Sequence, residues 1–165
     1  MVDVAREAGV ASGTVYLYYA SKLDLFAALS AQLFEVIAGA MQDASAPADV
    51  RGGTRTRIHG VFEACREHRD LLRLVFLNPD PRTEVARRMR RDDEKRLRPL
   101  VEILRAGMTA GAIRQADPTL LAEVINGLVV IALYQCFVHS DGSDVEAYED
   151  TVTAMIVGGL TPPSE

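Results

Sequence analysis

The chain has 165 residues, of which 48% are hydrophobic and 25% charged, and its formal net charge is −5. This composition is typical of a soluble globular protein that can bury a core, and the acidic balance argues against general nucleic-acid binding. No unbroken apolar run reaches the ~18 residues of a membrane span, and the N-terminus lacks the pattern of a signal peptide. We therefore expect a cytoplasmic protein with no membrane partner.

Few residue patterns indicate catalysis or metal binding. Cys65 and Cys136 lie in predicted helices with apolar neighbours, which favours buried free thiols in a reducing compartment. His59, His68 and His139 lie far apart in the sequence and form no ligand pattern. There is no Ser/His/Asp ordering and no glycine-rich phosphate loop. We therefore expect no metal, no cofactor and no enzymatic activity.

The first twenty residues predict two short helices joined by a tight turn. Val2–Ala8 has a small apolar stripe at helical spacing, and Gly9 can adopt the positive φ that ends a helix. Ser12 can cap a second helix that starts with Gly13 and Thr14. Two short helices around such a turn make a helix-turn-helix, a unit that places its second helix in the major groove of DNA.

The rest of the chain predicts further helices and no strands, so the expected fold class is all-α. Apolar spacing, caps and breakers give the following ranges: Ser21 to about Ala44, Thr54–Glu67, Leu71–Leu77, Thr83–Ala110, Leu120–Phe137 and Val145–Val157. The expected loops lie at Ser45–Asp49, Gly52–Gly53 and Asn78–Pro81, and Gly158–Gly159 is expected to follow the last helix.

One predicted helix, Leu120–Phe137, is apolar on nearly every side. A helix without a polar face is buried on both sides, and one small domain offers a single core. The second side is therefore expected to meet another subunit. We predict a homodimer formed through the last two helices, at about 118–139 and 144–157.

The N-terminal segment resembles the DNA-binding signature of the tetracycline-repressor (TetR) family. The resemblance runs through the stretch VAREAGVASGTVYLYYASKLDLFAAL, where the shared positions are Val4, Ala5, Ala8, Gly9, Val10, Gly13, Thr14, Tyr16, Tyr19, Ser21, Lys22 and Leu25. It implies a DNA-binding region with a linking helix in residues 1–44 and a helical effector-binding and dimerisation domain in residues 45–165. Family members have a further helix before this signature, so we expect the first helix of the DNA-binding region to be missing here.

The resemblance also implies roles for individual residues. The expected DNA contacts are Ser12, Gly13, Thr14, Tyr16, Leu17, Tyr18 and Lys22. The expected lining of a ligand pocket is Phe62, Cys65, Met89, Leu104 and Tyr134, although core packing is the alternative for each of these.

Two functions remain open at this point. The first is a homodimeric transcription regulator, a repressor that a small apolar effector releases from a palindromic operator. The second is a helical dimeric scaffold or interaction module that has lost DNA binding together with its first helix.

Overall fold

The computed structural model describes residues 1–42, 49–77 and 84–162, and for residues 84–95 it describes the backbone alone. These residues form helices and contain no strand, which confirms the all-α prediction. The helices, in chain order, are α1 (Val2–Glu7), α2 (Ser12–Tyr18), α3 (Lys22–Met41), α4 (Val50–Glu67), α5 (Arg69–Phe76), α6 (Glu84–Thr109), α7 (Pro118–Leu133), the π-helical η1 (Tyr134–His139) and α8 (Val145–Leu160).

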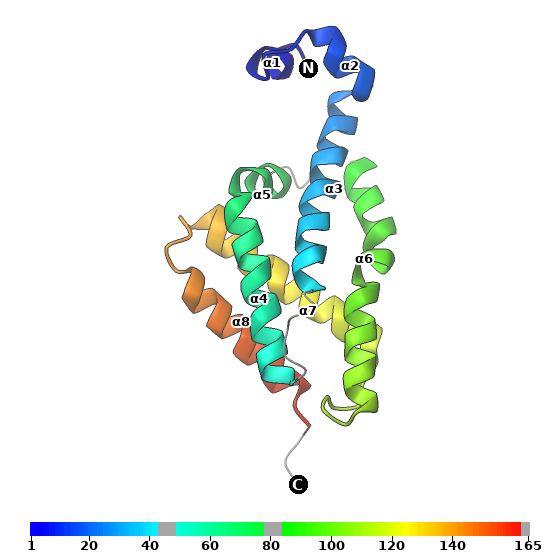
Figure 1. The fold of residues 1–165 in the computed structure, drawn as a ribbon, viewed down its shortest axis with the longest axis vertical. Coiled ribbons are helices and arrows are strands. Elements are labelled where there is room, and N and C mark those ends of the chain that lie inside the picture. Colours follow the sequence, from blue (N-terminus) through cyan, green and yellow to red (C-terminus); the bar gives the residue numbers. More distant parts are fainter. Residues whose placement is uncertain (43–48, 78–83, 163–165) are drawn as a thin grey trace.

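The helices form a small N-terminal head and a larger bundle (Figure 1). Helices α1 and α2 make up the head and pack against each other at one end of the long helix α3. The other end of α3 enters the bundle, where it contacts α4, α5 and α6. Helix α4 also packs on α8, and α6 packs on α7. A single helix thus connects the head to the bundle.

The hydrophobic core lies entirely in the bundle. It draws on every helix from α3 to α8, and its largest fully buried side chains are Phe62, Phe137, Leu33, Ile58, Leu72, Leu104 and Leu133. The head contributes one buried hydrophobic residue, Ala5, which lies outside this core. Most of the hydrophobic stabilisation therefore belongs to residues from α3 onward, because it scales with the apolar area removed from water.

Two glycine pairs lie inside helices, so the predicted boundaries there were wrong. Helix α4 starts at Val50 because Asp49 caps it, its Oδ1 accepting from the Gly52 amide at 2.7 Å. Gly53 is buried in the same helix. Gly158–Gly159 likewise lies within α8, which continues to Leu160. In both places tertiary packing outweighs the weak helix propensity of glycine.

Two other helix ends have clear local causes. Asp117 caps α7, its Oδ1 accepting from two first-turn amides at 2.8 and 3.1 Å, and Pro118 follows as the first helical residue. His68 separates α4 from α5, as expected. Most of the expected loop at Ser45–Asp49, and all of the one at Asn78–Pro81, lie outside the described residues.

Two helices have the length and mean hydropathy of a membrane span, which the count of unbroken apolar runs did not predict. They are α3 and the continuous helical stretch Pro118–His139. Both pack against other helices of the bundle, and the core helices of soluble proteins commonly reach such values. The absence of a membrane partner stays a prediction.

Candidate functional site

The head has the helix-turn-helix geometry that the sequence predicted. Gly9 has a φ of 67°, the left-handed conformation that glycine adopts without strain. Around it the Val10 amide donates to the Ala5 carbonyl at 3.0 Å, and the Gly9 amide donates to the Arg6 carbonyl at 3.2 Å. These bonds satisfy the last carbonyls of α1 and reverse the chain toward α2.

Helix α2 presents almost its whole surface to solvent. The predicted contact residues on it are all exposed, namely Ser12, Gly13, Thr14, Tyr16, Leu17 and Tyr18. Leu17 and Tyr18 are 83% and 77% exposed. Val15 and Tyr19, which are half-buried, turn toward the rest of the protein, as expected for Tyr19. Six of the seven predicted contact residues thus lie on one short, accessible helix, and Lys22 begins the next.

Ser12 does not cap α2, in contrast to the prediction. The N-cap is Ala11, whose carbonyl accepts from the Thr14 amide at 2.9 Å, and no side chain caps this helix. Ser12 is instead the first helical residue. Its side chain is exposed in the first turn of α2, so its hydroxyl is available to a polar partner.

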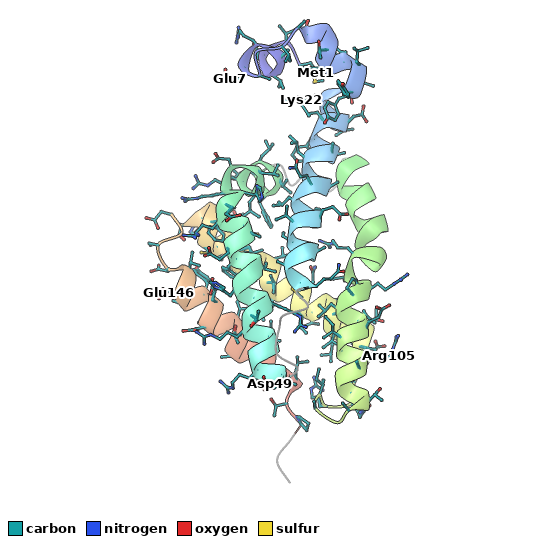
Figure 2. All side chains as sticks on the ribbon, viewed as in Figure 1. Met1, Glu7, Lys22, Asp49, Arg105 and Glu146 are labelled. Carbon is teal, nitrogen blue, oxygen red and sulfur yellow. The ribbon has the colours of Figure 1, made fainter. Side chains whose placement is uncertain are left out.

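The start of α3 is fixed by Ser21 and Asp24, which have the spacing of a capping box. Ser21 Oγ accepts from the Asp24 amide at 3.1 Å and donates to Asp24 Oδ2 at 2.7 Å. Lys22, the next residue, is exposed at the junction of the head and the bundle (Figure 2). This cap therefore fixes the backbone at Lys22, which follows α2 by four residues.

The head carries little positive charge. Helix α2 has no charged residue, and Arg6 on α1 pairs with Asp3 at 2.8 Å on the surface. Across residues 1–41 the bases are Arg6 and Lys22, and the acids are Asp3, Glu7, Asp24 and Glu35. The exposed hydroxyls of α2 and the ammonium of Lys22 are thus the groups that this head offers to a polyanion.

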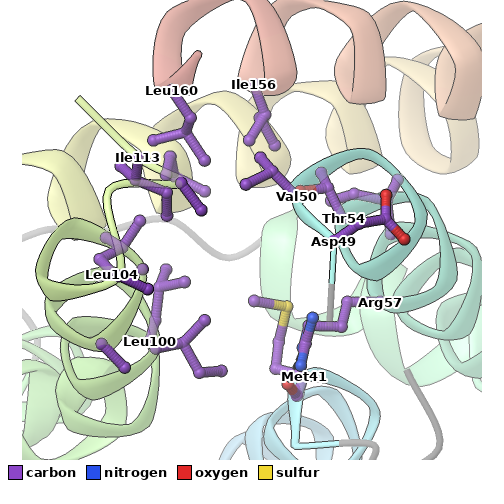
Figure 3. Close-up of a pocket in the computed structure, with 17 residues that line it drawn as sticks. Met41, Asp49, Val50, Thr54, Arg57, Leu100, Leu104, Ile113, Ile156 and Leu160 are labelled. Atoms are coloured by element: carbon purple, nitrogen blue, oxygen red, sulfur yellow. Dashed lines mark hydrogen bonds between the residues drawn. The ribbon is translucent and has the colours of Figure 1, made fainter. Parts of the chain in front are cut away.

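A cavity of about 390 Å³ opens in the bundle, at the end away from the head (Figure 3). Its walls come from the end of α3, the start of α4, the last turns of α6 and parts of α7 and α8. Most of the lining is aliphatic, including Met41, Ile58, Leu100, Leu104, Ile113 and Leu160. Polar groups at the cavity come from Asp49, Thr54 and Arg57.

Arg57 connects this cavity to the linking helix. Its Nε donates to the carbonyl of Met41, the last residue of α3, at 3.1 Å. Met41 itself lines the cavity. A molecule bound there would contact both the guanidinium of Arg57 and the end of the helix that carries the head.

The predicted pocket residues separate in the structure. Leu104 lines the cavity, whereas Phe62, Cys65 and Tyr134 are not among its lining residues. Phe62 is fully buried in the core against Phe137, with ring centroids 6.0 Å apart, and Tyr134 packs against Phe76. Met89 lies outside the residues whose side chains are described. Sequence analysis missed Met41, Arg57 and Ile113, because three distant helix ends and a loop bring them together.

The two cysteines are free and buried, as predicted. Burial raises the pKa of the Cys65 thiol to about 12 and also raises the pKa of Cys136, where nearby carboxylates add to the effect. Both thiols are therefore protonated at neutral pH and poor nucleophiles.

Comparison with known proteins supports the identification of the head. Residues 1–29 match the family model described as bacterial regulatory proteins, tetR family. None of the curated proteins matches the chain significantly.

Solved structures of regulators share the fold of the whole chain. The fatty acid degradation regulator FadR from Bacillus halodurans is 25% identical with a TM-score of 0.76, and the match covers 96% of this chain and 87% of that one. The TetR-family regulator PfmR from Thermus thermophilus is 17% identical with a TM-score of 0.74, over 98% and 88%. A TetR-family regulator from Marinobacter aquaeolei is 22% identical with a TM-score of 0.65, over 97% and 83%.

Proposed function

We infer from its fold and its N-terminal signature that the chain is a TetR-family transcription regulator. On this premise we propose that it is a homodimeric repressor, which a small molecule releases from a palindromic operator. The observation that carries this proposal is the exposure of every predicted contact residue of α2 in a segment that matches the family model. Operator binding, dimerisation and effector binding use three different parts of the fold.

Operator binding is assigned to α2 and the start of α3. Gly13 lets the backbone approach DNA closely, while the Ser12 and Thr14 hydroxyls can contact phosphates or base edges. The exposed Tyr16 and Tyr18 hydroxyls suit phosphate oxygens, and Lys22 adds a cation to this surface. With so few charges, we expect affinity to depend on fitted polar contacts and to have a shallow dependence on salt.

Dimerisation is assigned to α7 and α8, which pack against each other. Leu120, Val124 and Ile131 lie along one exposed stripe of α7 and are 60%, 62% and 52% exposed. On α8, Met155 is 57% exposed beside exposed small residues that allow close approach of a second helix. The buried Val129 faces the core, so Val124→Arg and Met155→Arg are the substitutions that test the interface. Each should convert the dimer to a monomer in light scattering, with the helical content unchanged.

Effector binding is assigned to the cavity that Arg57 and Met41 share. Its aliphatic walls and one guanidinium match an apolar molecule that carries a carboxylate. The likeness to a regulator named for fatty acid degradation is consistent with this chemistry. An effector that moves the Met41 end of α3 also moves the head, and half-sites about 34–36 Å apart on DNA tolerate little change in spacing.

Selection of bound sequences from random DNA duplexes tests the proposal. We expect the selection to enrich a palindromic sequence that the protein binds as a dimer. The Thr14→Ala variant should no longer enrich this sequence. Enrichment of no sequence by the folded dimer would favour the scaffold function instead.

Titration of the bound operator with medium- and long-chain carboxylic acids then tests release. Arg57→Leu should weaken the effect of an active acid, because it removes the cation at the cavity. Arg55→Leu is the matched control, since Arg55 pairs with Asp150 on the surface at 3.1 Å and does not line the cavity. Acids that bind without changing operator affinity would refute coupling, which must act equally in both directions.

A further inference from the structure

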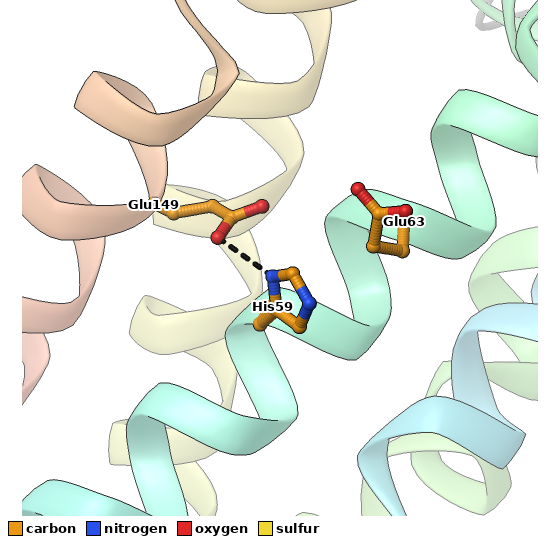
Figure 4. A group of neighbouring side chains, drawn as sticks. All are labelled: His59, Glu63 and Glu149. Carbon is orange, nitrogen blue, oxygen red and sulfur yellow. Dashed lines mark hydrogen bonds and ion pairs between the residues drawn. The ribbon is translucent and has the colours of Figure 1, made fainter.

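Helices α4 and α8 bring together three side chains that can ligate a metal ion (Figure 4). His59 and Glu63 lie one turn apart on α4, and Glu149 lies opposite them on α8. Their potential ligand atoms all lie within 4.8 Å of one another. Sequence analysis did not predict this group, because Glu149 is 90 positions away from His59 and has no local pattern.

The geometry points to a site for a divalent first-row transition metal such as Zn²⁺, bound by His59, Glu63 and Glu149. Nothing in the proposed regulator function requires this site. It would join α4, which lines the effector cavity, to α8, which carries the proposed dimer face. The metal would thus add a further link between two helices that already pack together and share the surface ion pair of Arg55 with Asp150.

The distances suit coordination. His59 Nδ1 and Glu149 Oε2 are 3.0 Å apart. Two ligands that each lie about 2.0–2.2 Å from a tetrahedral zinc ion are about 3.3–3.6 Å apart, so this pair has to open only slightly to hold one. Residues four apart on a helix face the same direction, so Glu63 joins the pair through a change of rotamer. A donor set of one imidazole nitrogen and two carboxylates favours transition metals over Mg²⁺.

The surroundings leave room for the remaining ligands of a metal ion. The three residues lie in an open hollow of about 460 Å³ between α4 and the start of α8. Carboxylates dominate the charge of its described lining, with Asp144 and Glu146 beside Glu63 and Glu149, against the guanidinium of Arg66. Water molecules can complete the coordination shell there, and the acidic balance attracts a cation.

Arg66 is the competitor for this site. Its Nη2 donates to Glu63 Oε2 at 2.5 Å, so Glu63 is held by a surface ion pair. His59 and Glu149 also form an ion pair without any metal when the imidazole is protonated. A metal site and a pair of surface ion pairs differ in the side chains that they require. Only the metal site needs all three side chains at once, and only the metal site gains from the loss of Arg66.

Zinc titration of the purified, chelator-treated protein by calorimetry tests the proposal. We expect one Zn²⁺ per chain at micromolar affinity, and thermal stabilisation that rises with zinc concentration. His59→Ala and Glu149→Gln should each weaken binding at least about tenfold, and Glu63→Gln should do the same. Arg66→Ala should strengthen binding, because it frees the Glu63 carboxylate and removes a positive charge.

His68→Ala and His139→Ala are the matched controls, because both histidines lie outside the hollow. Circular dichroism without metal shows that each variant folds, which a surface site permits. The proposal is overturned if zinc gives no saturable binding in the micromolar range. It is equally overturned if Mg²⁺ binds as tightly as Zn²⁺, or if binding survives both His59→Ala and Glu149→Gln.

Discussion

The head and the bundle differ in how they use their apolar residues. The bundle buries a core of large side chains, as in the contact between Phe62 and Phe137, whereas the head has no such core and exposes Tyr16, Leu17 and Tyr18. The head buries one alanine, and it reaches the bundle through α3. Stability and DNA recognition are therefore assigned to separate residues. Substitutions in the bundle should change stability first, and substitutions on α2 should change binding without changing stability.

The largest expected effect is the loss of core packing at Phe62. Truncation of a fully buried phenylalanine costs about 3–5 kcal/mol of unfolding free energy, so Phe62→Ala should lower the denaturation midpoint strongly. Leu17→Ala is the matched substitution in the head and should change stability by less than about 0.5 kcal/mol, because Leu17 is mostly exposed. Urea denaturation measures both. Equal losses from the two variants would contradict the separation of stability from recognition.

A smaller effect is expected where α6 meets the loop that follows it. A Cβ at Gly107 would lie 2.5 Å from Ile113 Cδ1, and Ile113 is buried at the cavity wall. Gly107→Ala should therefore cost about 1–3 kcal/mol and alter effector binding.

Gly39→Ala is the control for this substitution, since a Cβ at Gly39 in α3 meets nothing within 4 Å. It should stabilise the protein by about 0.5–1 kcal/mol through helix propensity. A Gly107→Ala variant with unchanged stability and effector affinity would show that Ile113 moves freely.

A smaller loss of stability is expected from substitutions at the junction of the head and the bundle. Ser21→Ala removes the cap of α3 and should cost about 1 kcal/mol, as measured by thermal unfolding. It should also reduce operator affinity, because the cap fixes the backbone at Lys22. Ser12→Ala should leave stability unchanged, since Ala11 is the N-cap of α2. If Ser12→Ala lost more stability than Ser21→Ala, Ser12 would be the cap of α2, as the sequence alone predicts.

At neutral pH the smallest effect is expected at Cys65, because its contribution to stability changes only at alkaline pH. Burial raises its pKa from the ordinary value of 9.0 to about 12, so the folded protein holds a proton that the unfolded chain releases in this interval. The contribution of Cys65 to stability is constant below pH 9 and falls as the pH rises toward 12. Cys65→Ser should flatten this dependence in alkaline unfolding curves. A native thiol that reacts rapidly with a disulfide reagent at neutral pH would contradict the burial.

Sequence analysis predicted the head better than the cavity, and the reason is physical. The turn at Gly9 and the two short helices around it follow from local rules on turns and helix faces. The start of α4 at Val50 was missed, because the Asp49 cap and the packing of Gly53 outweigh the low helix propensity of two glycines. Boundaries of this kind depend on tertiary contacts.

The functional groups of the bundle were harder still to predict. The meeting of Arg57 with Met41, like that of His59 with Glu149, depends on which helices pack together. A periodic pattern shows that a residue lies on one helix face but does not identify the facing helix. Phe62 and Cys65 were thus assigned to a pocket that lies elsewhere in the same bundle.

The central claim is that α2 and Lys22 form the DNA-binding surface, and the salt dependence of operator affinity tests it most directly. Wild-type protein and Lys22→Ala are titrated onto the selected operator, and onto an unrelated duplex, over a range of salt concentrations. We expect Lys22→Ala to weaken binding to both duplexes and to lower the slope of log affinity against log salt by about 0.9 for each phosphate that is no longer neutralised. An unchanged slope and affinity in the folded variant would contradict the claim.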